Sequence, residues 1–170
     1  MVKINEGFSG EGNGVFTYPQ SKTDPQAVRQ ALSKLEWSSS SGDIGAFLRK
    51  FEQMGGIVEE MIDAHEVRSP SVQMRIQPDG NAKLVSSHEQ VLGGNTGQVY
   101  LGCRFPAREV YRLMIQEQAQ RIGEVLSKKG VIGRFGIDFL LTRHNGGSWQ
   151  SHALEINLRM GGTTPPFHAL

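Results

Sequence analysis

The sequence predicts an α+β fold built on antiparallel sheets, and three observations support this class. Candidate strands follow one another through tight turns, as at Pro78-Asp79-Gly80-Asn81 and His144-Asn145-Gly146-Gly147. Such turns join antiparallel strands. Apolar residues recur with the helical period in three longer segments. The 170 residues contain no internal repeat. Helices mixed with hairpin-joined strands are typical of the α+β class.

The N-terminal part is expected to begin with two strands, residues 2–5 and 15–18, around a glycine-rich loop. A first helix is expected after Asp24-Pro25, because aspartate caps helix N-termini and proline fits the first turn. A second helix is expected over residues 43–54, ended by the glycines that follow. One face of this second helix carries its apolar residues: Ile44, Phe47, Leu48 and Phe51.

From residue 57 onward the pattern is dominated by strands. The expected strands are residues 57–62, 71–76, 82–87, 133–141 and 150–157. A loop rich in Gly, Asn and Gln is expected over residues 90–98. The longest helix is expected over residues 107–129, because Lys128-Lys129-Gly130 suits a helix C-terminus by charge and conformation. A further helix is expected to start at Pro165.

Composition favours a soluble, cytoplasmic protein. Net charge is +1 with both signs mixed along the chain, so no nucleic-acid or membrane partner is expected. No apolar run is long enough for a membrane span. The lone Cys103 excludes an internal disulfide and favours a reducing compartment. Because the chain begins within a strand and stops within a helix, a fragment is expected.

Three polar residues near the C-terminus form a candidate metal site. Strand side chains alternate between faces, so Glu155 and Asn157 share one face. Asp138 lies opposite the apolar face of the preceding strand, and a loop of four to six residues places it across from residues 153–155. Two carboxylates and an amide suit Mg²⁺ or Mn²⁺, which also take phosphate ligands. A solvated hairpin face remains the alternative.

Residues around this set favour a phosphate ligand. Arg159, in register with Asn157, offers charge to a phosphate oxygen. The polar turn Gly161-Gly162-Thr163-Thr164 exposes backbone N–H groups suited to an anion. Near the N-terminus, Lys3 precedes the glycine-rich loop, in which glycines allow close backbone approach to a triphosphate. A loop that merely turns, with Lys3 on a solvent face, is the alternative there.

In this order the motifs resemble the ATP-grasp superfamily over essentially the whole chain. The motif Gly136-Ile137-Asp138-Phe139 with Glu155-Ile156-Asn157 is similar to its metal-binding strands, and Val58-Glu59-Glu60-Met61-Ile62 to its adenine-binding hinge. Residues 87–94 and 97–102 resemble the peptide-ligase branch related to the pheganomycin enzyme. The resemblance implies an ATP-grasp fold with a small subdomain, residues 1–62, and a larger one, residues 63–170, truncated at its C-terminus.

The resemblance also implies roles for individual residues. Asp138, Glu155 and Asn157 would bind Mg²⁺, and Arg159 would act in catalysis. The residues implied to contact ATP come from the hairpin, the hinge and a ribose-binding glutamate: Lys3, Ser9, Gly10, Gly12, Asn13, Glu59, Glu60, Met61, Ile62 and Glu66. The implied activity is ATP-dependent joining of a carboxylate to an amine through an acyl phosphate. Family enzymes also have an N-terminal domain, which is expected to be missing here.

Several assignments stay open. Arg75, His88, Gly161, Gly162 and Thr163 are candidate substrate contacts, with a surface arginine and an ordinary loop histidine as the alternatives for the first two. Nucleophilic catalysis is not expected at Cys103, which has no partner base nearby in sequence. A non-catalytic nucleotide-binding module is the alternative to the ligase. ATP-dependent ADP release separates the two functions.

Overall fold

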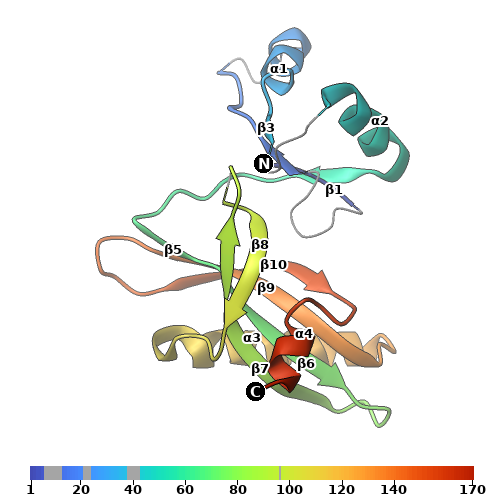
Figure 1. Ribbon diagram of the computed structural model, residues 1–170, viewed down its shortest axis with the longest axis vertical. Coiled ribbons are helices and arrows are strands. Elements are labelled where there is room, and N and C mark those ends of the chain that lie inside the picture. The colour runs from blue at the N-terminus through green and yellow to red at the C-terminus, as the bar shows by residue number, and fades with distance from the viewer. Residues whose placement is uncertain (6–12, 21–23, 38–42, 96) are drawn as a thin grey trace. The chain divides into compact units, whose positions relative to one another are not determined.

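The computed structural model describes residues 1–5, 13–20, 24–37, 43–95 and 97–170 (Figure 1). Contacts divide this part of the chain into two compact units. The first unit is Met1–Ile62 with Leu92–Leu101, and the second is Asp63–Val91 with Gly102–Leu170. Within the described ranges, no helix combines the length and apolar character needed to cross a membrane.

The first unit contains a four-stranded antiparallel sheet in the order β3-β2-β1-β4. Its strands are β1 (Val2–Ile4), β2 (Asn13–Val15), β3 (Glu36–Trp37) and β4 (Gly56–Val58). The strand predicted over residues 57–62 is confirmed only at its start, because the ladder with β1 ends at Val58. The strand predicted over residues 15–18 instead covers Asn13–Val15, so the prediction is wrong beyond Val15, and β3 was not predicted.

Two capped helices accompany this sheet, α1 (Pro25–Leu32) and α2 (Ile44–Met54). Asp24 Oδ1 accepts a hydrogen bond from the Gln26 N–H at 2.9 Å, which satisfies one unpaired donor at the start of α1. Asp43 does the same for α2 by accepting from the Gly45 N–H at 2.8 Å. Both predicted helix starts are confirmed.

A small apolar core holds the first unit. Val2, Leu35 and Phe47 are 3%, 7% and 5% exposed, and the Phe47 ring meets Trp37 edge-on at 5.1 Å. Leu48, predicted on the buried face of α2, is 46% exposed. Adjacent helical residues are turned about 100° from each other, so burying Phe47 turns Leu48 outward. The predicted face is therefore wrong at this position.

The second sheet is six-stranded and runs in the order β10-β9-β6-β7-β8, with β5 also pairing to β9. Its strands are β5 (Glu66–Arg68), β6 (Pro70–Ile76), β7 (Ala82–Gly93), β8 (Val99–Arg104), β9 (Gly133–Arg143) and β10 (Gln150–Asn157). All pairings of β9, with β10, β6 and β5, are antiparallel. This confirms the predicted α+β class with antiparallel sheets.

The predicted loop over residues 90–98 is wrong in its first part, because β7 continues to Gly93. Neither β5 nor β8 was predicted. Residues such as Gln90 and Gly93 have low strand propensity, but pairing within a sheet overrides such preferences. The length of β7 therefore depends on neighbouring strands rather than on local composition.

Helix α3 (Glu109–Lys128) packs on one face of the second sheet (Figure 1). Tyr111, Ile115 and Ala119 are at most 1% exposed and meet the apolar side chains of β6 and β9. Gly123 allows close approach, because a Cβ there would lie 3.0 Å from the Cβ of Ala82. The prediction of a helix over residues 107–129 is confirmed to within two residues.

The Glu89 carboxylate on β7 accepts two hydrogen bonds from the start of α3. Glu89 Oε1 accepts from the Arg108 N–H at 3.0 Å and from the Tyr111 hydroxyl at 2.7 Å. Arg108 provides no side-chain cap of its own. Burial, together with Glu89, raises the pKa of the Tyr111 hydroxyl, so it remains a donor. The short helix α4 (Thr164–His168) follows β10, and its Phe167 ring lies 5.8 Å from that of Phe105.

Truncation in the α3 core should cost far more than truncation on its outer face. Ile115→Ala should lower the free energy of unfolding by about 2–5 kcal/mol, because Ile115 is fully buried. The matched change Leu113→Ala, at a 69% exposed side chain on the same helix, should cost under about 1 kcal/mol. Urea unfolding measures both, and equal losses would contradict the observed face of α3.

Candidate metal and nucleotide site

The register between β9 and β10 brings the two candidate carboxylates together. Asp138 pairs directly with Glu155, and Gly136 pairs with Asn157. The connecting loop spans residues 144–149, which is within the predicted range. The register shifts between Ala153 and Glu155, so β10 has one more residue than β9 at this point of the ladder. Because cross-strand partners share a face, Asp138 and Glu155 lie side by side on the sheet.

The buried side of β9 determines where Asp138 points. Its apolar side chains pack toward α3 and are at most 1% exposed: Phe135, Ile137, Phe139 and Leu141. Alternation then places Asp138 on the opposite face. On β10 the predicted apolar face is largely uncovered, since Leu154, Ile156 and Leu158 are 43%, 44% and 57% exposed. In the described sheet β10 is a terminal strand, paired with β9.

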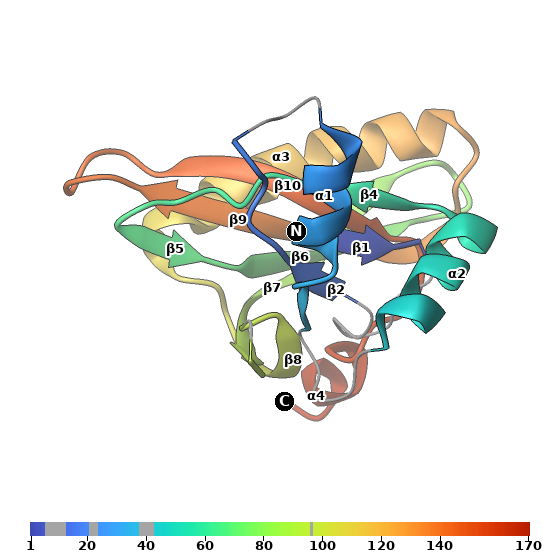
Figure 2. The same ribbon diagram turned by 90° about the horizontal axis from the view of Figure 1, so that it is seen from above.

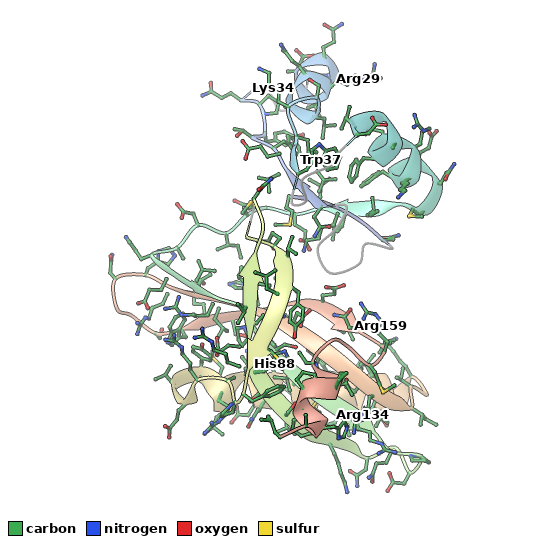
Figure 3. All side chains as sticks on the ribbon, in the orientation of Figure 1. Arg29, Lys34, Trp37, His88, Arg134 and Arg159 are labelled. Atoms are coloured by element: carbon green, nitrogen blue, oxygen red, sulfur yellow. The ribbon has the colours of Figure 1, made fainter. Side chains whose placement is uncertain are left out.

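A short chain of hydrogen bonds connects the polar set. Asn157 Nδ2 donates to Asp138 Oδ2 at 3.2 Å, and Arg159 Nη2 donates to Asn157 Oδ1 at 3.2 Å. Arg159 itself is exposed, after the end of β10 (Figure 3). The guanidinium therefore adds positive charge beside the carboxylates while keeping access to solvent.

Asp138 is held in an environment that disfavours its charge. Burial raises the pKa of this carboxyl above its usual value, and the negative charge of Glu155 raises it further. The Ser71 hydroxyl, Arg159 and the Asn157 amide act in the opposite direction. Two carboxylates packed together in this way favour a bound cation.

Two further residues continue this row across the sheet. Ser71 on β6 pairs with Asp138, and His88 on β7 pairs with Ser71. Both are 1% exposed. Burial lowers the pKa of His88 to about 4, so its ring is neutral at neutral pH. Sequence reasoning missed Ser71, although the alternation Ser71-Val72-Gln73-Met74 signals a polar face. The alternative reading of His88 as an ordinary loop histidine is wrong, because His88 lies within β7, and its contact with substrate stays a prediction.

A family described as IQCH-like, ATP-grasp matches the chain over residues 16–162. The matched range includes Asp138, Glu155 and Asn157. The chain belongs to the ATP-grasp family. The family predicted from the motifs is therefore confirmed.

Two relatives are similar to part of this ATP-grasp chain. The L-propargylglycine–L-glutamate ligase of Streptantibioticus cattleyicolor is 44% identical over 116 residues, which are 68% of this chain and 22% of that protein. IQ motif-containing protein H of Danio rerio is 24% identical over 115 residues, or 68% of this chain and 11% of that protein. The chain thus spans less than a quarter of either relative.

Solved structures share the ATP-grasp fold at low sequence identity. Biotin carboxylase from Campylobacter jejuni, in a beta-gamma-ATP complex, matches with a TM-score of 0.65 and 16% identity over 99% of this chain and 33% of that one. N5-carboxyaminoimidazole synthetase from Staphylococcus aureus, complexed with ADP, matches with a TM-score of 0.59 and 15% identity over 95% and 35%.

In the first unit, the residues predicted to contact ATP lie near the β1 and β4 strands. Lys3 Nζ and Glu59 Oε2 form an ion pair at 2.5 Å, with both side chains about one quarter exposed. The Glu59 N–H donates to the Met1 carbonyl at 2.8 Å, which anchors the hinge segment to β1. Asn13 begins β2 and pairs with Lys3. The predicted residues Ser9, Gly10 and Gly12 lie outside the described part of the chain.

The remaining hinge residues are open to solvent. Met61 and Ile62 are 49% and 39% exposed, and Glu60 is also exposed. Apolar side chains that protrude from a loop in this way suit contact with a flat apolar ligand. Their role in ATP binding stays a prediction.

The Glu66 carboxylate forms an ion pair with Arg143 in the second unit. It accepts from Arg143 Nε at 2.7 Å and pairs with Arg143 Nη2 at 2.5 Å. Arg143 also lies over the Trp149 ring at 4.6 Å. Along β9, Arg143 is five residues from Asp138, or roughly 16 Å. The structure therefore does not bring Glu66 to the carboxylate set, and its ribose role stays a prediction.

The predicted substrate contacts fall in different surroundings. Arg75 is exposed and pairs in register with Lys83 and Arg134. Thr163 is 5% exposed and helps to line a small cavity with Gln73, Ser86 and Arg134. Gly161 and Gly162 precede it in the turn before α4, where the Thr164 N–H donates to the Gly161 carbonyl at 3.1 Å.

Protonation of His88 should destabilise the fold in acid. Its pKa is about 4 in the fold against 6.5 ordinarily. Between these pH values the unfolded chain binds more protons, so the free energy of unfolding should rise with pH from about 4 to about 6.5 and then level off. The full rise is about 3 kcal/mol. Urea unfolding of the wild type across this window measures it.

The His88→Phe variant should lack this rise, since it keeps an aromatic ring beside Phe105 without a titrating group. The matched change His168→Phe, at an exposed histidine, should keep it. An unchanged slope in His88→Phe would contradict the assignment to His88.

Proposed function

We propose that this protein is a Mg²⁺·ATP-dependent ligase that joins a carboxylate to an amine. The main support for this proposal is the polar set on β9 and β10. In this set, Asp138 and Glu155 are in direct register, and the Asn157 amide donates a hydrogen bond to Asp138. The 44% identity to an amino-acid ligase supports the same class and its peptide-ligase branch. We therefore propose amino acids or short peptides as substrates, acted on in the cytoplasm.

The donor set suits magnesium. Asp138, Glu155 and Asn157 offer only oxygen ligands, and Mg²⁺ uses a few such ligands while leaving positions for water and phosphate. Burial and the neighbouring Glu155 disfavour the Asp138 charge, a cost that a divalent cation offsets. The Asn157 amide completes the proposed set, since its carbonyl oxygen is a third oxygen ligand beside the two carboxylates. When bound, the ion neutralises phosphate charge.

Coordination by Asn157 requires a local change. Its Oδ1 accepts from Arg159 and its Nδ2 faces Asp138. Release of Arg159 toward a phosphate oxygen would free Oδ1 for the metal. Arg159 is exposed and lies after the end of β10, so a movement of its side chain leaves the pairing of β10 with β9 unchanged.

We assign the two subdomains to residues 1–62 and 63–170, and we propose nucleotide contacts for residues within each of them. Lys3, freed from Glu59, would offer charge to a phosphate, while Glu59, Glu60, Met61 and Ile62 would meet the adenine. Ser9, Gly10, Gly12 and Asn13 would cover the phosphates, and Glu66 would bind the ribose. The Lys3–Glu59 pair is partly exposed, so its separation costs little.

The proposed reaction has two balanced steps. A substrate carboxylate oxygen attacks the γ-phosphorus of ATP, the bond to the β-phosphate oxygen breaks, and ADP leaves with that electron pair. The amine then attacks the acyl carbon, the bond to the phosphate oxygen breaks, and the amine loses a proton. In such transfers, positioning and charge neutralisation dominate the rate enhancement. Arg159 would stabilise charge on the transferring phosphoryl group.

Ligase activity should appear as ADP release that depends on three components. The protein, in the full length that its gene encodes, is incubated with Mg²⁺·ATP, pooled amino acids as carboxylates, and pooled amino acids and peptides as amines. ADP should form only when Mg²⁺, ATP and the amino-acid and peptide pools are all present, and mass spectrometry should show a product lighter than its two precursors by one water. Tight ATP binding without ADP release would instead support a non-catalytic nucleotide-binding module.

Removal of a metal ligand should abolish Mg²⁺-dependent nucleotide affinity without unfolding the protein. Glu155→Gln removes one charge and Asn157→Ala removes one donor, so each should lose at least about tenfold in ATP affinity with Mg²⁺ present, as calorimetry would show. Glu117→Gln, which removes an exposed carboxylate from α3, is the matched control and should bind like the wild type. Wild-type titrations for both site variants would refute the metal assignment.

A further inference from the structure

Strand β6 has a polar face and an apolar face. Val72, Met74 and Ile76 are at most 1% exposed and pack in the core under α3. Ser71 and Gln73 therefore lie on the opposite face, with Asp138 and Gly136 as their partners on β9. Ser71 is nevertheless 1% exposed, so its hydroxyl is enclosed on the side of the sheet that carries the carboxylates.

The register places four polar residues in one row across four adjacent strands. The order is His88 on β7, Ser71 on β6, Asp138 on β9 and Glu155 on β10. Directly opposed side chains on neighbouring strands have Cβ atoms roughly 4.5–5.5 Å apart. His88 and Asp138 are thus both neighbours of Ser71, one on each side.

Two atoms of this row are buried without a hydrogen-bond partner among the described residues, namely Ser71 Oγ and His88 Nδ1. An unpaired buried polar atom costs about 1–3 kcal/mol, so each such atom calls for an explanation. Their two side chains are opposed in register and share one face of the sheet, so the two atoms belong to neighbouring side chains. The Ser71 hydroxyl already favours the charged form of Asp138, as a donor to the carboxylate would.

We propose that His88 acts through Ser71 as a positioning residue for Asp138. His88 Nδ1–H donates to Ser71 Oγ, and the Ser71 hydroxyl donates its one proton to the Asp138 carboxylate. Ser71 thus gives Asp138 a second hydrogen-bond donor besides Asn157. This donor lies on the side of Asp138 away from Glu155. The functional part of this inference rests on the proposed role of Asp138 as a metal ligand.

The direction of this chain follows from hydrogen-bond chemistry. A carboxylate only accepts, whereas a hydroxyl has one proton to donate and lone pairs that accept. A neutral imidazole has one N–H and one acceptor nitrogen. If Ser71 donated to His88 instead, its lone pairs would face the buried carboxylate and repel it. Only donation from His88 to Ser71 to Asp138 satisfies all three groups.

The immediate surroundings keep His88 in place. Its ring lies 5.2 Å from that of Phe105, which in turn contacts Phe167 of α4. Figure 3 shows His88 and Arg159 in separate parts of the second unit, with His88 on β7 and Arg159 after the end of β10. Residues that orient metal ligands in this way commonly contribute 10- to 100-fold in metal affinity.

The first test reads the hydrogen bonds without metal or nucleotide. Nitrogen-15 NMR at neutral pH should show His88 as the Nδ1–H tautomer, with its signals assigned by their loss in His88→Phe. In Ser71→Ala the Nδ1–H loses its acceptor, so the population should shift toward Nε2–H. Ser71→Thr retains the hydroxyl and should restore the wild-type tautomer. An Nε2–H tautomer in the wild type, or no change in Ser71→Ala, would overturn the proposal.

The second test asks whether the two residues act as one unit. Ser71→Ala and His88→Gln should each weaken Mg²⁺-dependent ATP binding roughly tenfold, and the double variant should be no weaker than Ser71→Ala. His88→Asn should bind close to wild type, because its amide nitrogen takes the place of Nδ1, whereas that of glutamine takes the place of Nε2. Without Mg²⁺, all variants should bind ATP as the wild type does.

The outcomes separate this inference from the proposed function. Additive losses in the double variant, or equal binding by the Asn and Gln variants, would overturn the positioning role. If wild-type ATP binding does not depend on Mg²⁺, the proposed metal role of Asp138 fails. The tautomer measurement then still decides whether the row of hydrogen bonds exists.

Discussion

The structure of the second unit depends on the burial of one face of β9 against α3. Phe135, Ile137, Phe139 and Leu141 are almost fully buried there, and a shift of one residue would move all of them to the other side of the sheet. Such a shift would lose most of the apolar contact with α3. The same alternation holds Asp138 on the opposite face, so core packing determines the direction of a functional side chain. Figure 2 shows the second sheet and α3 from above.

This arrangement has an electrostatic consequence. Asp138 lies partly buried beside Glu155, and Asn157, Arg159 and the Ser71 hydroxyl favour its charged form. Neighbouring carboxylates repel each other, and a bound cation offsets that repulsion. The second sheet thus holds a carboxyl whose pKa is raised by burial and by a neighbouring carboxylate, a combination that is common at functional sites.

Local sequence patterns predicted much of this arrangement, but they did not predict long-range pairing. The alternation in β9, the length of the loop before β10 and the caps of α1 and α2 are short-range features, and they led to the Asp138–Glu155 pair. The contact of Ser71 with Asp138 joins residues 67 positions apart in the chain, and no local pattern encodes its register. The ion pair of Glu66 with Arg143 joins residues 77 positions apart in the chain, and it was not predicted for the same reason.

The central claim is that the Mg²⁺·ATP site activates a carboxylate. Transfer of oxygen from substrate to phosphate tests it most directly. Amino acids labelled with oxygen-18 in their carboxylates are supplied with Mg²⁺·ATP and unlabelled amines, and the released phosphate is analysed by mass spectrometry. The account predicts one oxygen-18 atom in each phosphate released with ADP. Unlabelled phosphate, formed in equal amount to ADP, would show that water attacks ATP and would contradict the account.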